Sequence, residues 1–151
     1  MNLYDVRLLL VRANEIRATP FLSSEEEREE DDEGFDAKLN VEIVSPIKDL
    51  KVGDEFEVSI TLVTLAEEQP FFSMTMIGTF EILGEAAIGD LIHANAPYEL
   101  GSLLYPYIRN LAKPIIEYLG ASAIDIPFAP PPPPSPPSKK TSAKKRRLPS
   151  K

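Results

Sequence analysis

The stretch Ala94–Ala129, with the sequence ANAPYELGSLLYPYIRNLAKPIIEYLGASAIDIPFA, decides the fold. At about 100° per residue, most of its large apolar side chains fall on one side of a helix and its charged side chains fall on the other. The pattern predicts an amphipathic helix of roughly two dozen residues. The predicted apolar side consists of Leu100, Leu103, Leu104, Tyr107, Leu111, Ile115 and Tyr118.

Two prolines, Pro106 and Pro114, interrupt this predicted helix. Each removes a backbone hydrogen bond and crowds the preceding turn, at a cost of about 3 kcal/mol in a regular helix interior. We therefore expect a helix that is kinked or that begins near Pro106, and that ends at Gly120 with a left-handed cap. Such a helix needs a large apolar surface to pack against.

Four segments upstream alternate apolar and polar side chains as β-strands do. They are Leu3–Val11, Lys38–Val44, Asp54–Leu65 and Phe71–Leu83. The sequence therefore predicts an α+β fold, in which a four-stranded antiparallel meander packs on a long C-terminal helix.

The strand faces expected to point away from the helix also carry apolar side chains. These are Leu9, Val11, Val63, Leu65, Phe71 and Ile77. A solitary small domain rarely exposes this much apolar surface, and burial between subunits explains it. Together with a helix that needs a partner, this surface predicts a tetramer built as two dimers.

The composition excludes several classes of site. The chain of 151 residues has no cysteine, so disulfides, zinc–thiolate sites and thiol nucleophiles are absent, and its single histidine, His93, rules out a histidine cluster. No catalytic constellation is present, and we expect neither enzyme activity nor a cofactor. No apolar run approaches the length of a bilayer span, and charges interrupt the N-terminal apolar run, unlike a signal peptide. We therefore expect a cytoplasmic protein.

Charge is distributed very unevenly along the chain. Up to Phe128 there are 24 acidic and 9 basic residues, whereas the remainder has seven Lys and Arg and no acid. The run Glu25–Glu33 holds eight of the acids. It reads either as a solvated, self-repelling loop or as a docking surface for a basic partner, the protein's own tail included.

The last residues differ in character from the rest, and we predict a domain over 1–129 and a disordered tail over 130–151. The tail begins with a proline-rich segment, typical of polyproline II, and continues with the basic segment KKTSAKKRRLPSK. It is either a solubilising tail or a tether to nucleic acid, anionic lipid or an acidic protein.

Three segments carry a family resemblance. Leu104–Arg109, LYPYIR, resembles the "FPYAR" signature that opens the long helix of SecB, the bacterial protein-export chaperone. Phe72–Ile82, FSMTMIGTFEI, is similar to the fourth strand of that family, and Ile124–Pro130, IDIPFAP, is similar to the segment after its helix. The resemblance covers about Leu3 to Pro130.

The resemblance implies four antiparallel strands plus helices, assembled as a dimer of dimers with the long helices between the sheets. It implies an ATP-independent holdase that binds unfolded polypeptides in apolar grooves and hands secretory precursors to the SecA motor. Family members that dock on SecA use acids on the exposed sheet face, where this chain has Ser73. The acidic run Glu25–Glu33 and the basic tail also depart from the family pattern.

Three functions remain open at this level. The first is a SecB-like holdase for export or client stabilisation, the second is a SecB-like chaperone dedicated to antitoxins, and the third is an oligomeric interaction module whose tail binds nucleic acid or membrane. For a holdase, we expect an adaptable apolar groove on the fourth strand and around the helix. Its predicted residues are Phe71, Phe72, Met74, Met76, Ile77, Tyr98, Leu103, Leu104, Tyr107 and Phe128.

Overall fold

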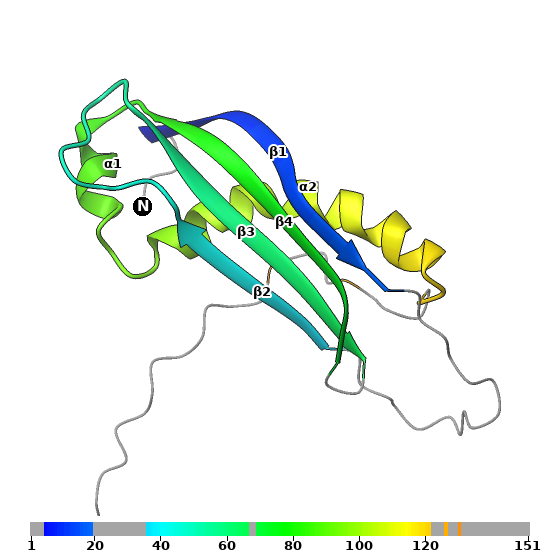
Figure 1. The fold of residues 1–151 in the computed structure, drawn as a ribbon. Coiled ribbons are helices and arrows are strands. Elements are labelled where there is room, and N and C mark those ends of the chain that lie inside the picture. Colours follow the sequence, from blue (N-terminus) through cyan, green and yellow to red (C-terminus); the bar gives the residue numbers. More distant parts are fainter. Residues whose placement is uncertain (1–4, 20–35, 67–68, 122–125, 127–129, 131–151) are drawn as a thin grey trace, which may run out of the picture.

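The computed structural model describes residues 5–19, 36–66, 69–121, 126 and 130. They form one four-stranded sheet, a long helix across one face of it and a short helix beside the end of the last strand (Figure 1). The elements, in chain order, are β1 (Val6–Ala18), β2 (Asp36–Ile43), β3 (Glu55–Ala66), β4 (Gln69–Ile82), α1 (Glu85–Asp90) and α2 (Ala96–Tyr118). The predicted antiparallel sheet with a long C-terminal helix is confirmed. The acidic run Glu25–Glu33 lies outside the described residues, as does the tail apart from Pro130.

The strand order is β1-β4-β3-β2, with every neighbouring pair antiparallel. The segment β2-β3-β4 is a meander of consecutive hairpins, whereas β1 joins its far edge and pairs with β4. This is a Greek-key order rather than a continuous four-strand meander. Alternation along a strand specifies its two faces but not its neighbour, so the sequence alone did not reveal the place of β1.

Strand β1 is longer than predicted and is bulged. Its register against β4 shifts between Leu8, which pairs with Phe80, and Leu10, which pairs with Thr79. One extra residue, Leu9, lies between them, and an extra residue reverses which later side chains face the core. Val11, expected on the outer face, therefore lies opposite Gly78 on the helix side.

Helix α2 begins ten residues before Pro106 and continues through both prolines, so the expectation of a start near Pro106 was wrong. Both prolines lie on exposed positions of the helix. The carbonyls that lose their helical donors, those of Ser102 and Asn110, are therefore on the side of the helix away from the sheet. Beyond the helix, Gly120 has a φ of 89°, in agreement with the predicted left-handed cap.

The buried side of α2 is rotated relative to the predicted apolar side. It consists of Ala96, Leu100, Gly101, Leu104, Tyr105, Ile108, Ala112 and Ile116. Only Leu100 and Leu104 belong to both sets, while Tyr107, Leu111 and Tyr118 are exposed. Small residues allow a close approach to the sheet, but Tyr105, Ile108 and Ile116 are buried as well, so the predicted side was misplaced for large side chains too.

Two glycines set how closely α2 approaches the sheet. Leu104 fills the space above Gly78 of β4, where a Cβ atom would collide with the leucine Cδ atoms. On the helix itself, a Cβ at Gly101 would lie 2.8 Å from Cγ2 of Val41 on β2. Beneath α2, Phe56 and Phe80 stack with their ring centroids 5.6 Å apart. Helix α2 therefore packs closely on β2 through Gly101 and on β4 through Leu104.

We predict that Gly101→Ala lowers the free energy of unfolding by about 1–2 kcal/mol, because the overlap with Val41 exceeds the gain in helix propensity. Gly89→Ala is the matched control, since Gly89 lies in α1 and a Cβ there meets no atom within 4 Å. Denaturant titration of both variants measures the difference. A midpoint for Gly101→Ala at or above that of the wild type would contradict the proposed packing.

Candidate functional site

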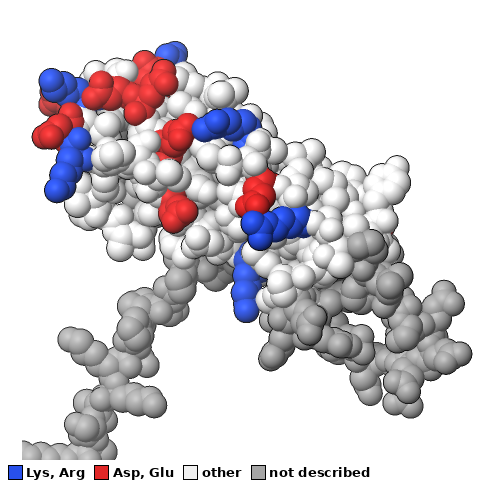
Figure 2. Space-filling view, in the orientation of Figure 1, with Lys and Arg blue, Asp and Glu red and all other residues white. Residues whose placement is uncertain are grey.

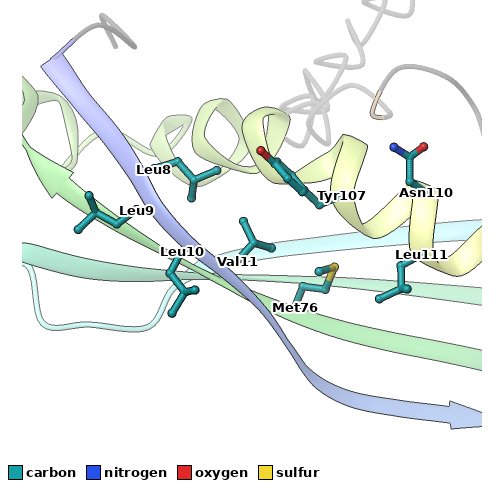
Figure 3. A pocket seen from close by; sticks show the side chains of 8 residues that line it. All are labelled: Leu8, Leu9, Leu10, Val11, Met76, Tyr107, Asn110 and Leu111. Carbon is teal, nitrogen blue, oxygen red and sulfur yellow. The ribbon is translucent and has the colours of Figure 1, made fainter.

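An apolar groove lies between the edge strand β1 and the exposed side of α2. Its volume is about 640 Å³ and we call it the β1–α2 groove. It is lined by Leu8, Leu9, Leu10, Val11, Met76, Tyr107, Asn110 and Leu111. Figure 3 shows Leu8, Val11 and Met76 on the sheet side, with Tyr107 and Leu111 reaching from α2 on the other.

The bulge in β1 is what gives the groove its apolar rim. The bulge lies within the run Leu8–Val11, which contributes all four of its residues to the groove lining. It turns Val11 toward the helix and Leu10 away from it. Tyr107 and Leu111 are four residues apart on α2, so they lie one above the other on the same side of the helix. Both walls of the groove therefore come from regular elements, which hold their side chains in place.

The apolar side chains of α2 continue beyond the groove. Tyr107, Leu111 and Tyr118 form an outward stripe of exposed apolar side chains, and Leu103 beside it is half-buried against the core. Tyr107 is 51% exposed, Leu111 is 40% exposed and Tyr118 is 93% exposed. A helix with apolar side chains on two sides is typical of a helix that is buried on both sides.

The groove suits an apolar polypeptide segment. Its lining contains no charged side chain, and Asn110 is the polar side chain that it offers. Because β1 is an edge strand, one side of its backbone has no neighbouring strand among the described residues. Apolar walls beside an unpaired strand edge permit side-chain contacts that tolerate many sequences, together with backbone hydrogen bonds.

The structure separates most of the ten predicted groove residues from this surface. Phe71, Phe72, Met74, Met76 and Leu104 are buried in the core, and Tyr98 and Leu103 are half-buried against it. Ile77 pairs with Arg12 and Ser59 on the sheet face opposite the helix, and Phe128 lies outside the described residues. Only Met76 and Tyr107 line the β1–α2 groove. Whether any of the ten contacts a client stays a prediction.

Sequence reasoning missed the contribution of β1 to this surface. Leu8, Leu9 and Leu10 form a run without alternation, which is the local signal of a bulge. Asn110 was missed because a polar side chain in an apolar helix has no sequence signature of its own.

Within residues 5–19, 36–66, 69–121, 126 and 130, no three His, Asp or Glu side chains are grouped so that they could hold a metal ion. His93 is exposed in the connection between α1 and α2. Neither described helix combines the length and the apolar composition that crossing a membrane requires.

Arg109 connects the helix to the segment that follows it. Its Nε donates a hydrogen bond of 3.2 Å to the carbonyl of Ile126, whose side chain is buried. Arg109 is the arginine of the LYPYIR motif, and Ile126 belongs to IDIPFAP. Two of the segments that carry the family resemblance are thus in direct contact.

A solved structure shares this architecture. The Mycobacterium tuberculosis SecB-like chaperone Rv1957, in complex with a ChAD peptide from the Rv1956 HigA1 antitoxin, matches with a TM-score of 0.59 and 12% sequence identity. The match covers 84% of this chain and 89% of that chain. The fold is SecB-like. No protein-family model matches the sequence, and no curated protein is similar to it.

We predict that Arg109→Ala lowers the free energy of unfolding by about 1–2 kcal/mol, because the carbonyl of buried Ile126 loses a charged donor. Lys113→Ala, at an exposed position one turn further along α2, should change it by less than about 0.5 kcal/mol. Denaturant titration compares the two. Equal losses would mean that the hydrogen bond to Ile126 contributes nothing specific.

Proposed function

We propose that this protein is an ATP-independent chaperone that holds unfolded or partly folded polypeptides. The observation that carries the proposal is the β1–α2 groove, an open apolar surface on a SecB-like fold. Holding a polypeptide requires apolar contact and no covalent catalysis. The groove offers apolar walls, with the amide of Asn110 among them. Export, client stabilisation and antitoxin protection are the roles compatible with this activity.

An antitoxin-like segment is the client class with direct support from a comparison. The structurally similar Rv1957 is complexed with a peptide from an antitoxin. A short, extended, apolar segment fits the groove between two regular elements, and such a segment is what an unfolded antitoxin or a secretory precursor presents. We therefore propose extended apolar peptides as the client class.

The sheet face opposite the helix gives little support to a partnership with SecA. Ser73, which stands where family members would carry an acid, pairs with Arg17 on one side and Val63 on the other. Arg17 is paired with Glu15, so the surroundings of Ser73 carry one charge of each sign instead of an acidic cluster. Transfer of clients to SecA is therefore not included in the proposed activity.

We also propose that the protein assembles as a homotetramer, built as a dimer of dimers. The support is the outward stripe of α2, which ends in the almost fully exposed Tyr118. Covering this stripe with another copy removes the exposed aromatic surface from water and extends the groove past one subunit.

The first test concerns assembly. Light scattering of the purified protein at micromolar concentration should give a mass four times that of the chain. Tyr118→Asp should reduce it, because an exposed side chain contributes little to folding but places a charge in the proposed contact. A monomeric wild type would contradict the tetramer.

The second test concerns holding. Leu111→Asp should weaken suppression of client aggregation, without nucleotide, by about tenfold, because a charge enters an apolar groove. Ile47→Asp is the matched control: Leu111 is 40% exposed and Ile47 is 37% exposed, but Ile47 lies outside the groove. A wild type that neither binds an unfolded client nor slows its aggregation would refute the proposed function.

The same aggregation assay distinguishes a holdase from an interaction module whose tail does the binding. A full chain in which the basic residues of the tail are replaced by serine should keep its holding activity if the groove binds the client. Loss of binding in that variant would instead assign the activity to the tail.

A further inference from the structure

The sheet face opposite α2, which we call the outer face, is covered by no element among the described residues. Figure 1 shows α2 across one side of the sheet only, and Figure 2 views the other side directly. On that side most of the acidic side chains gather toward the end where β3 begins, with lysines and arginines among them, and fewer charges lie toward the opposite end (Figure 2).

The pairing of the strands explains this polarity. Glu55 and Glu81 are direct cross-strand neighbours, an arrangement in which like charges repel. Arg7 forms an ion pair with Glu81, and Arg12 forms one with Glu57 at 2.9 Å. Glu55 has no ion pair within the described residues.

Glu42 extends the same acidic end across β2. It pairs with Ser59, is exposed and has no ion-pair partner in the described part of the chain. At the other end of the outer face, Arg17 is paired with Glu15 at 2.7 Å, and Lys38 lies opposite Val63. Arg7 and Arg12 are already paired with Glu81 and Glu57. Glu42 and Glu55 therefore keep carboxylates without an ion pair in the described residues.

We propose that the C-terminal segment 139–151 of the same chain docks on the acidic end of the outer face. This segment has seven positive charges and no negative one, and four of them are consecutive in Lys144–Arg147. Its charge is opposite to that of Glu42, Glu55, Glu57 and Glu81, and no element of the described residues covers this face.

The length of chain beyond the folded domain permits this contact. The carbonyl of Ile126 accepts a hydrogen bond from Arg109 of α2, and Pro130 is half-buried, so the chain is still close to the domain at Pro130. The twenty-one residues that follow Pro130, up to Lys151, span about 65 Å at 3.1 Å per residue, the spacing of polyproline II. Strand β4, with 14 residues, is about 46 Å long at 3.3 Å per residue. The basic segment therefore reaches the acidic end of the sheet from its own domain.

Docking of this kind makes the tail an internal competitor. Any basic partner that approaches the acidic end of the outer face must first displace residues 139–151. The contact is electrostatic and solvent-exposed, so it weakens as added salt shortens the screening length to about 3 Å at 1 M. None of these carboxylates lines the β1–α2 groove, so docking of the tail does not depend on client binding.

The test uses the full-length protein and backbone amide chemical shifts, with no client present. Reversing the four charges in the tail with K144E, K145E, R146E and R147E should shift the amide signals of Glu55, Glu57 and Glu81. Those differences from the wild type should disappear in about 1 M NaCl. The E42Q/E55Q double variant should move the signals of Lys144–Arg147, whereas E15Q, at the other end of the face, should not.

Three outcomes overturn the proposal. Charge reversal that leaves the outer-face signals unchanged, or that moves only residues 25–33, excludes docking on this face. Shifts that persist in high salt exclude an electrostatic contact. Shifts that fade on dilution from millimolar to micromolar protein assign the contact to the tail of a second copy instead of the same chain.

Discussion

The contact between α2 and the sheet depends on two positions without side chains. Leu104 occupies the space that Gly78 leaves open, and Gly101 allows Val41 to reach the helix backbone. Side chains in a close-packed core have no room to absorb an extra carbon at such points. Because these contacts lie on different strands, they fix both the rotation of α2 and its direction across the sheet.

That rotation determines which surface is left for function. With Gly101 and Ala112 turned toward the sheet, several of the larger apolar residues of α2 turn away from it. Tyr107 and Leu111 then face β1, where they form one wall of the β1–α2 groove.

The sequence predicted the elements better than their contacts. Alternation located three of the strands to within a few residues, and the helix was expected from its apolar period. The side of the helix was misplaced because α2 carries large apolar side chains on two sides, and its period alone does not tell which side is buried. Val11 was misplaced because one bulged residue reverses the phase of a strand. The predicted site residues on β4, such as Phe72 and Met74, are apolar because they form the core, and composition does not distinguish core from groove. The place of β1 beside β4 follows from long-range pairing, which no local pattern encodes.

Strand β1 has a second register shift, between Ala13 and Glu15, in addition to the one at Leu9. Two interruptions divide its outer edge into short runs, each too brief for a long ladder of hydrogen bonds with an added strand. A protein that gathers aggregation-prone chains is exposed to the danger that its own sheet becomes a seed for their growth. The apolar groove still contacts a bound segment, but the irregular edge of β1 pairs with it over only short stretches. A bound segment therefore has no long straight strand on which further chains could add.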